Sequence, residues 1–346
     1  MDKDNKQIGY WLLLGAVLVV AMVVLGGYTR LSHSGLSMVT WKPVTGVVPP
    51  LSQAQWNEEF TKYKTSPEYR ERNYDFTVDQ FKTIYWPEFL HRLLGRVIGV
   101  AFLLPFLYFL STGKLKNKKL LFNLVVIFVL GGLQGFIGWY MVKSGLVDVP
   151  SVSHYRLAIH FITALTLFVY ILWTAMGVLY PKEEKSAPSS IKLLLNIVLG
   201  IVVLQLVYGA FVAGLKAGLF YPTFPKMGSE WMPKSIGMAI DTYGLRSFTE
   251  SPALVQFIHR WLAAIIVVLI GWIFYIGKKS DLSVTQRHSI NAMLLLVGIQ
   301  FLLGVYTLLY LVPISLGVLH QLGAVALLTT VVIAIYNFNH VKRPSL

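Results

Sequence analysis

Four histidines recur as two equivalent pairs along the chain and are the residues best suited to chemistry. His91 and His259 occupy the same place in the segments FLHR and FIHR, 168 residues apart. His160 and His320 follow in each half, at an offset of 160 residues. All four lie in apolar runs, where an ionisable side chain is costly and is a functional hypothesis by default. A lone histidine there is as often structural, but four at repeated positions favour function.

Two histidines on facing helices are suited to bind a planar group between them. Packed helices have axes about 8–10 Å apart, and a haem iron takes one ring nitrogen from each side. Zinc usually needs a third or fourth protein ligand, and no acid accompanies the second pair. We therefore predict two haem-sized sites, His91 with His160 and His259 with His320.

An arginine directly follows the first histidine of each pair. Arg92 and Arg260 stand at the depth where haem propionates need cationic partners near the aqueous surface. The alternative is that these side chains extend to lipid headgroups, and the repetition of the pair favours the propionate role.

Further polar and small residues stand in the third span of each half. Gln134 and Gln300 are expected to be interhelical hydrogen bonders. The glycines of GGLQGFIGWY are expected to permit close helix packing rather than contact with a ligand; they are Gly131, Gly132, Gly135 and Gly138.

Glu88 is an acid without an equivalent in the second half of the chain. It precedes His91 by three residues and shares its helix face, whereas Gln256 stands in the matching place before His259. A carboxylate here is suited to exchange protons with a molecule bound at the first site. The alternative is that Glu88 caps a helix N-terminus, where negative charge is favoured. The unshared acid predicts a reaction in the N-terminal half and electron transfer in the C-terminal half.

The composition places these residues in a membrane protein. Of 346 residues, 55% are hydrophobic and 13% are charged, against about 25% charged residues in ordinary soluble domains. The net charge of +14 is spread over short segments between apolar runs, which the positive-inside rule explains and nucleic-acid binding does not. The absence of cysteine excludes disulfides, iron–sulfur clusters and thiolate-ligated metals.

Eight apolar runs are long enough to cross a bilayer core of about 30 Å. They lie near residues 8–28, 90–111, 119–142, 156–180, 191–214, 257–276, 288–310 and 314–337. Basic residues concentrate in the short segments on one side of these spans, so both termini are predicted to be cytoplasmic. We expect an all-α integral membrane protein with eight transmembrane helices, the first of them retained.

The two four-span halves, residues 1–185 and 186–346, resemble each other as an internal repeat. An even number of spans keeps the second copy in the same orientation, so we predict two parallel four-helix bundles related about the membrane normal. Two larger loops, near 29–89 and 215–256, are expected on the outer face, close to the four histidines. The first is rich in aromatic residues, which favours a folded cap on the membrane surface over a disordered loop.

Over nearly its whole length the chain resembles the haem A synthases, in particular the mitochondrial and alphaproteobacterial type. The motifs that carry the resemblance are GGYTRLSHSGLSMVTWKPVTGVVPPLS, YWPEFLHRLLGR, GGLQGFIGWYMVKSGL, HYRLAIHF, AGLKAGLFYPTFPKMGSEWMP, QFIHRW and LHQLGA. Some bacterial members carry cysteine pairs in the outer loops. This chain has none, so a disulfide-dependent step does not transfer to it.

The resemblance implies an enzyme that oxidises the C8 methyl group of haem O to a formyl group, giving haem A for cytochrome c oxidase. It implies that His259 and His320 bind a haem b cofactor. It also implies that His91 and His160 belong to the substrate site and that Glu88 is important for activity.

Location and partners follow from the same resemblance. The expected location is a bacterial cytoplasmic membrane, with the haem sites towards its outer face. A haem O synthase is the expected source of the substrate, because haem O is apolar. The sequence does not identify the electron acceptor, and it leaves the oligomeric state open, with a homo-oligomer as one option.

Two other classes of function are compatible with parts of the pattern. A bis-histidine membrane cytochrome b would pass electrons from quinol without modifying haem. It would need haems at both membrane faces, whereas all four histidines are predicted near one, and it gives Glu88 no role. A transporter built from a four-helix repeat commonly has helices broken near the midplane, and these spans have few internal prolines, Pro105 being one.

Overall fold

The computed structural model describes residues 3–42, 45–180 and 188–339. The chain forms two compact units, Met1–Leu179 and Tyr180–Leu346. The predicted boundary between residues 185 and 186 lies outside the described residues. The same holds for four basic residues on which the predicted orientation depends, namely Lys182, Lys185, Lys342 and Arg343.

The prediction of eight long apolar helices is confirmed, and helix is the regular secondary structure of the described ranges. Unit 1 contributes α1 (Lys3–Leu31), α4 (Val78–Ser111), α5 (Lys118–Lys143) and α6 (His154–Leu179). Unit 2 contributes α7 (Ser189–Gly214), α10 (Pro252–Lys278), α11 (Val284–Leu309) and α12 (Ile314–Asn339).

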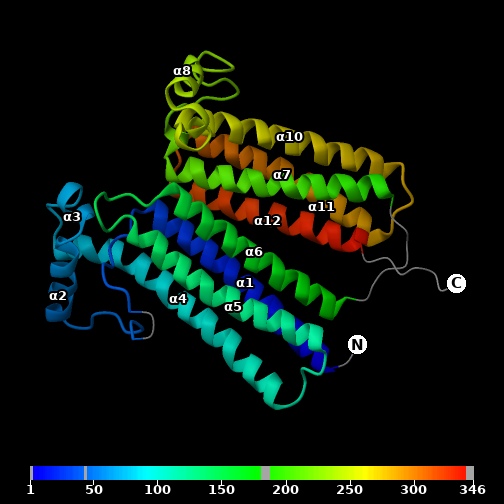
Figure 1. Ribbon diagram of the computed structural model, residues 1–346, viewed down its shortest axis with the longest axis horizontal. Helices are drawn as coiled ribbons and strands as arrows, with labels where there is room; N and C mark the ends of the chain where they lie inside the picture. The colour runs from blue at the N-terminus through cyan, green and yellow to red at the C-terminus, as the bar shows by residue number, and fades with distance from the viewer. Residues whose placement is uncertain (1–2, 43–44, 181–187, 340–346) are drawn as a thin grey trace. The chain divides into compact units, whose positions relative to one another are not determined.

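The four long helices of each unit have the same neighbours (Figure 1). In unit 1, α1 contacts α4 and α6, and α5 contacts the same two helices. In unit 2, α7 contacts α10 and α12, and α11 contacts the same two. Apolar side chains fill the interior of each bundle, among them Leu12 and Leu124 in unit 1 and Val198 and Ile270 in unit 2. Each half is thus a four-helix bundle, and the predicted symmetry between the halves stays a prediction.

Helix α4 begins twelve residues before the start of the predicted span. Thr77 is its N-cap: the Thr77 side chain accepts from the backbone N–H of Gln80, and the Gln80 side chain reaches back to the backbone N–H of Thr77. The hydropathy pattern missed this start because the first turns carry charged residues. Glu88 and His91 therefore lie well inside a continuous helix and not at its mouth.

The segment before α4 folds as a small cap, so the alternative of a disordered loop is wrong. Helices α2 (Gln53–Lys64) and α3 (Pro67–Glu71) lie at one end of unit 1 and pack on the first turns of α4. Trp56 and Tyr85 meet edge to face with ring centroids 5.0 Å apart, a contact that adds about 0.5–1.5 kcal/mol beyond area burial. The buried cluster comprises Trp56, Phe60, Tyr63, Phe81, Ile84, Tyr85 and Phe89.

Pro105 interrupts the hydrogen-bond ladder inside α4. It lacks the backbone N–H that would bond to the carbonyl of Ala101, four residues earlier. Trp11 of α1 supplies a donor, because its indole Nε1 lies 2.9 Å from that oxygen. An unpaired carbonyl in lipid costs several kcal/mol, so this bond fastens α1 to α4 where the ladder is broken.

Unit 2 has its own smaller cap between α7 and α10. It consists of the 3₁₀ turn η1 (Ala217–Leu219), α8 (Lys234–Tyr243), η2 (Gly244–Arg246) and α9 (Ser247–Glu250). Ile236 of α8 packs against Ala253 and Leu254 at the start of α10. Ser251 caps α10 by accepting the Leu254 N–H, which places His259 in the second turn after this cap contact.

Candidate functional site

His91 and His160 each lie against a glycine on a neighbouring helix of unit 1. His91 of α4 faces Gly26 of α1, where a Cβ would lie 3.1 Å from the ring Nε2. His160 of α6 faces Gly138 of α5, where a Cβ would lie 3.0 Å from the ring Cε1. Both glycines stand five residues before the end of their helix. The two rings therefore lie near the end of unit 1 that carries α2 and α3.

Unit 2 repeats this arrangement. His259 of α10 faces Gly209 of α7, and a Cβ there would lie 3.2 Å from the ring Cε1. His320 of α12 faces Gly304 of α11, and a Cβ there would lie 2.9 Å from the ring Cε1. These glycines also stand five residues before the end of their helices. Each unit therefore has both of its histidines near the same end of the bundle, each against a glycine of a neighbouring helix.

A side chain at any of these four glycines would crowd an imidazole, because its Cβ would lie 2.9–3.2 Å from a ring atom. Contacts near 3 Å are tighter than packed carbon atoms normally make, which is about 3.5–4.0 Å. The expectation of a shared packing role for the four glycines of α5 holds for Gly138 alone. A Cβ at Gly131, Gly132 or Gly135 would have no heavy atom within 4 Å.

Gln134 and Gln300 are interhelical hydrogen bonders, as predicted, and their partners are the histidines themselves. Nε2 of Gln134 lies 3.0 Å from Nδ1 of His160 and donates to the His160 carbonyl at 2.8 Å. Gln300 makes the same two contacts with His320, at 3.1 and 3.0 Å. In unit 1 the hydroxyl of Thr163 donates to Oε1 of Gln134 at 2.7 Å. A partner on one ring nitrogen fixes the orientation of the ring and decides which nitrogen carries the proton.

His259 has a glutamine partner of its own. Nε2 of Gln205, on α7, lies 3.3 Å from Nε2 of His259. Oε1 of Gln205 and Nδ1 of His259 are both buried and have no hydrogen-bond partner among the described residues. As placed, the amide nitrogen of Gln205 can only donate to the ring. A flip of the amide would bring its unpaired Oε1 to Nε2 of His259; the ring would then donate that N–H and keep on Nδ1 the lone pair that a metal ligand needs.

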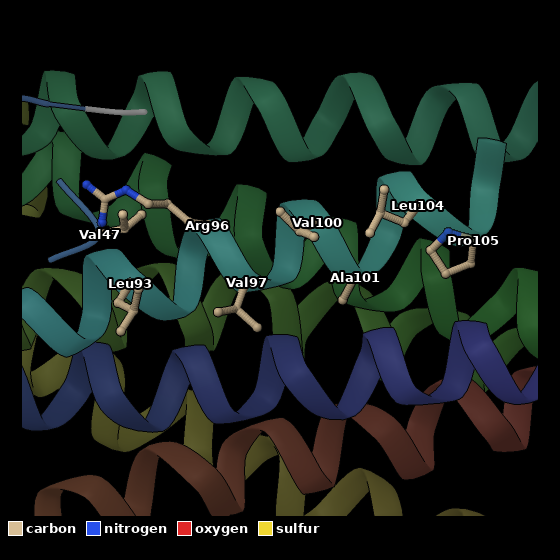
Figure 2. Close-up of a pocket in the computed structure, with 8 residues that line it drawn as sticks. All are labelled: Val47, Leu93, Arg96, Val97, Val100, Ala101, Leu104 and Pro105. Carbon is tan, nitrogen blue, oxygen red and sulfur yellow. The ribbon is translucent and has the colours of Figure 1, made fainter. Parts of the chain in front are cut away.

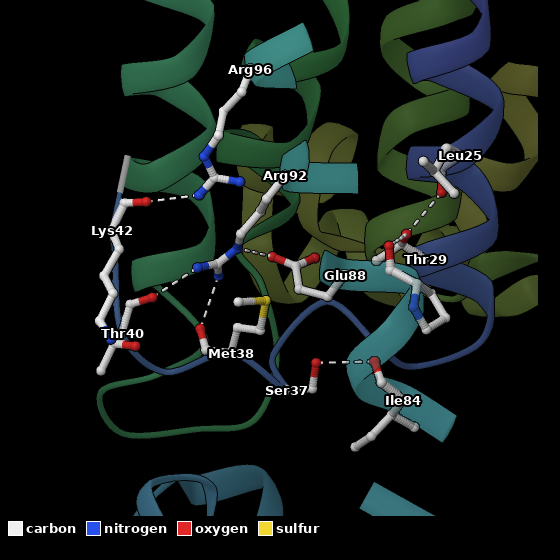
Figure 3. Close-up of polar contacts among 11 residues, drawn as sticks. Leu25, Thr29, Ser37, Met38, Thr40, Lys42, Ile84, Glu88, Arg92 and Arg96 are labelled. Carbon is white, nitrogen blue, oxygen red and sulfur yellow. Dashed lines mark hydrogen bonds and ion pairs between the residues drawn. The ribbon is translucent and has the colours of Figure 1, made fainter. Parts of the chain in front are cut away.

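Glu88 and Arg92 form a buried ion pair one turn apart on α4 (Figure 3). Nε of Arg92 donates to Oε1 of Glu88 at 2.6 Å. The Glu88 side chain is 5% exposed and the Arg92 side chain is 7% exposed. The N-cap of this helix is Thr77, eleven residues upstream. The interpretation of Glu88 as a helix cap is therefore wrong, because α4 starts earlier than its apolar run.

The other donors of Arg92 hold the loop that follows α1. Nη1 donates to the Thr40 carbonyl and Nη2 to the Met38 carbonyl, both at 2.9 Å. The guanidinium carbon also lies 5.2 Å from the centroid of the Trp41 ring, in a cation–π contact. In this structure the donors of Arg92 serve Glu88 and the loop, and its contact with a propionate stays a prediction.

Arg260 holds the cap of unit 2 in a similar way. Its Nη2 donates to the Tyr221 carbonyl at 2.6 Å and its Nη1 to the Thr223 carbonyl at 2.8 Å. Gln256, at the place of Glu88, donates to the same Tyr221 carbonyl at 3.1 Å. An amide cannot act as a general base, so of these two equivalent positions only that of Glu88 carries an acid.

A separate groove lies on α4 (Figure 2). It has a volume of about 440 Å³ and is lined by apolar side chains such as Val97, Val100 and Leu104, with Arg96 at one end. Val100 is nine residues after His91, and nine residues make two and a half helical turns. The two side chains therefore leave opposite faces of α4, and the groove is not part of the histidine pair.

The donor set of each unit fits a haem iron better than an isolated metal ion. Two imidazoles can take the axial positions of an iron whose other four ligands belong to the porphyrin. In the described ranges, no group of three or more His, Cys, Asp or Glu side chains is placed to hold a metal ion. Nδ1 of His259 is buried and has no hydrogen-bond partner among the described residues, which agrees with a ring nitrogen left for a ligand.

The sequence matches the COX15-CtaA family of cytochrome oxidase assembly proteins over residues 9–332. The chain belongs to this family. The haem A synthase of Flavobacterium psychrophilum is 45% identical over 340 residues, which cover 97% of this chain and 99% of that protein. That of Nitrosospira multiformis is 44% identical over 328 residues, covering 94% and 91%. Haem A synthase COX15 of Arabidopsis thaliana is 44% identical over 355 residues, covering 99% and 76%. The resemblance inferred from the motifs is confirmed.

Three features of the site in this family member were not predicted: the glycine against each histidine, the contact of Gln205 with His259, and the Glu88–Arg92 pair. The last had a usable signal, because an acid and a base four residues apart on a helix are neighbours. The glycine contacts depend on helix bounds that the sequence does not give. Gln205 had no signal from the repeat, because the first half has no glutamine at that place.

Proposed function

We propose that this protein is a haem A synthase that oxidises the C8 methyl group of haem O to the formyl group of haem A. The observation that carries the proposal is the unshared acid. The two histidine pairs share their glycine contacts and the glutamine beside the second histidine, yet only the first is accompanied by a buried carboxylate, that of Glu88. Similarity over the full length to proteins named haem A synthase supports the same function.

In this proposal unit 1 binds the substrate and unit 2 binds a resident haem b. His91 and His160 would hold haem O through its iron. His259 and His320 would ligate haem b, which supplies one-electron chemistry when bound. The contacts that the two sites share explain how one fold accepts two haems, and the difference in charge beside them separates their roles.

Glu88 is the proposed acid–base residue of unit 1. Two successive two-electron oxidations would convert the methyl group to an alcohol and then to a gem-diol, with dioxygen or an external electron acceptor taking up the electrons, and loss of water from the gem-diol would give the aldehyde. A positioned carboxylate can exchange the protons of these steps. Glu88 shares a helix face with His91, because the two are three residues apart. Arg92 fixes the orientation of the carboxylate through its 2.6 Å contact. Arg92 and Arg260 remain the proposed partners of the haem propionates.

The eight apolar helices make this a multi-pass membrane protein. We place it in a bacterial cytoplasmic membrane, in keeping with its similarity to bacterial proteins. The distribution of basic residues supports both termini in the cytoplasm. The haem sites would then lie towards the outer face. Haem O is apolar and does not cross water freely, so we propose that a haem O synthase delivers it.

Expression together with a source of haem O tests this function. Haems extracted from the purified protein are separated by chromatography and identified by mass, and haem A is expected. Haems B and O alone would refute the synthase and favour a bis-histidine cytochrome b that passes electrons. His91→Ala is the matched variant: it should lose haem A and keep the haem b of unit 2.

A further inference from the structure

One difference between the two units lies on the first helix of each bundle, four residues before the glycine that contacts a histidine. In unit 2 this position is Gln205, and in unit 1 it is Met22. Gln205 presents its amide to His259, with 3.3 Å between the amide nitrogen and the ring Nε2. Met22 carries no hydrogen-bonding N–H or O–H, and its Cε lies against Gly95, 3.3 Å from where a Cβ would stand.

This difference gives the two histidine pairs unequal support. His160, His320 and His259 each lie within hydrogen-bond distance of a glutamine amide. No described residue makes a hydrogen bond to the ring of His91. Unit 2 therefore has two imidazoles held by amides, and unit 1 has one.

A second partner matters to a metal-ligating histidine in two ways. It holds the ring in the orientation that ligation needs, so less freedom is lost when the metal binds. It also fixes the tautomer, and where it accepts the other ring N–H it raises the basicity of the ligating nitrogen. Loss of such a partner typically lowers metal affinity by about 10- to 100-fold. A ring without a partner is ordered by the metal alone and releases it more readily.

We propose that this difference separates a resident haem from an exchangeable one, an inference that rests on the proposed function. Gln205 is a positioning residue that keeps haem b in unit 2 between turnovers. Met22 leaves the ring of His91 without an amide partner, so unit 1 takes in haem O and gives up haem A. A synthase must release its product, whereas a haem that carries electrons must stay bound. Met22 allows the release from unit 1, and Gln205 retains the haem of unit 2.

Gln205→Met tests the first half of the proposal by the rate of haem loss. Full-length protein loaded with haem b is mixed with excess apomyoglobin, and haem transfer is followed by absorbance. We expect loss from unit 2 to be about 10- to 100-fold faster than in the wild type. The low-spin spectrum of two axial histidines should be retained before transfer, which a merely misfolded protein would not show.

Met22→Gln tests the second half with a second equivalent of ferric haem, added to protein already loaded with haem b. We expect release of this second haem to be at least about 10-fold slower, while haem b leaves unit 2 at the wild-type rate. Met22→Leu is the matched control. It changes the shape of the side chain without adding a hydrogen-bonding group, so the second haem should leave at the wild-type rate.

Equal rates of haem loss for Gln205→Met and the wild type would overturn the proposal. Slower release from Met22→Leu as well as from Met22→Gln would also overturn it. Where Gln205→Met fails to fold, Gln205→Asn withdraws the amide from the ring by one methylene and is expected to give the same faster loss. If the wild type makes no haem A but the variants show these differences in the rate of haem loss, the proposed reaction is refuted and the positioning role of Gln205 stands.

Discussion

Oε1 of Glu88 lies 2.6 Å from Nε of Arg92, and the same guanidinium bonds to the carbonyls of Met38 and Thr40. The carboxylate beside the first histidine pair is thus connected to the loop that covers it. A buried ion pair is weak evidence for stability, because the cost of desolvation opposes the attraction. Since unit 2 keeps the loop contacts with Gln256 in place of the acid, the charge at Glu88 is better explained by chemistry than by folding.

Glu88→Gln should leave haem bound and stop the formation of haem A. The amide keeps an oxygen that can accept the N–H of Arg92, and unit 2 accommodates a glutamine at the equivalent position. The variant loses only the ability to exchange a proton, so haem content should be normal. Chromatography of the extracted pigments should show haems B and O without haem A. A normal yield of haem A would remove Glu88 from the mechanism.

Arg92→Ala should damage the fold more than Glu88→Gln does. It leaves the buried carboxylate without its partner, and breaking a buried pair in this way typically costs about 3–5 kcal/mol. Thermal unfolding of the purified protein in detergent measures the difference. Arg156→Ala is the control, because Arg156 donates to the exposed carbonyl of Tyr140 and lies 3.8 Å from the centroid of the Tyr140 ring, and loss of these two contacts should cost about 1–2 kcal/mol. Equal midpoints for the two arginine variants would show that the Glu88 pair is dispensable.

His259→Ala should abolish the absorbance of haem b. Removal of one axial ligand leaves the iron without the second imidazole that holds it in unit 2, and Gln205 then has no ring to orient. His91→Ala, the equivalent change in unit 1, should keep the haem b spectrum while it loses haem A. A bis-histidine spectrum that persists in His259→Ala would refute the assignment of haem b to unit 2.

The spans and the histidine pairs could be predicted because their signals are local. Hydropathy over about 20 residues locates a span, and the repeated FLHR and FIHR segments locate the first histidine of each pair. The start of α4 could not be found this way, because Asp79 and Lys82 lower the hydropathy of its first turns. A helical spacing of four residues between Phe81, Tyr85 and Phe89 does mark the buried face of those turns.

The contacts that tune the histidines were beyond the sequence for a different reason. A glutamine within an apolar run predicts an interhelical hydrogen bond but not its partner, which depends on helix register. Gln134 and Gln300 were recognised because they repeat. Gln205 was not, because Met22 stands at the equivalent position. The position at which the two halves differ, Gln205 in one and Met22 in the other, is thus the one that the repeat could not reveal.

Glu68 of the cap should make stability depend on pH. Burial raises the pKa of Glu68 to about 7 from an ordinary value of 4.5, opposed by the hydrogen bond from Tyr63 and the charge of Arg72. The folded protein therefore binds this proton more tightly than the unfolded chain does. The stabilisation is complete below pH 4.5 and is lost as the pH rises through about 7, a fall of about 3 kcal/mol.

Thermal unfolding between about pH 5 and pH 8 measures this fall, with Glu68→Gln as the matched variant. The amide cannot titrate, so the variant should lose this component of the pH dependence. Tyr63 donates to Oε2 of Glu68 at 3.2 Å, and the amide oxygen of glutamine can accept the same bond. The same slope in both proteins would assign the pH dependence to another group.

Gly138→Ala should weaken haem binding in unit 1, whereas Gly131→Ala on the same helix should not. A Cβ at Gly138 would lie 3.0 Å from Cε1 and 3.5 Å from Nε2 of His160. The ring must therefore move, although Gln134 holds its Nδ1 at 3.0 Å. A Cβ at Gly131 meets no heavy atom within 4 Å, and alanine there favours the helix by about 1 kcal/mol.

In titrations with a second equivalent of ferric haem, Gly138→Ala should bind about 10-fold more weakly and Gly131→Ala like the wild type. Equal affinities would show that the glycine at His160 does not shape the site.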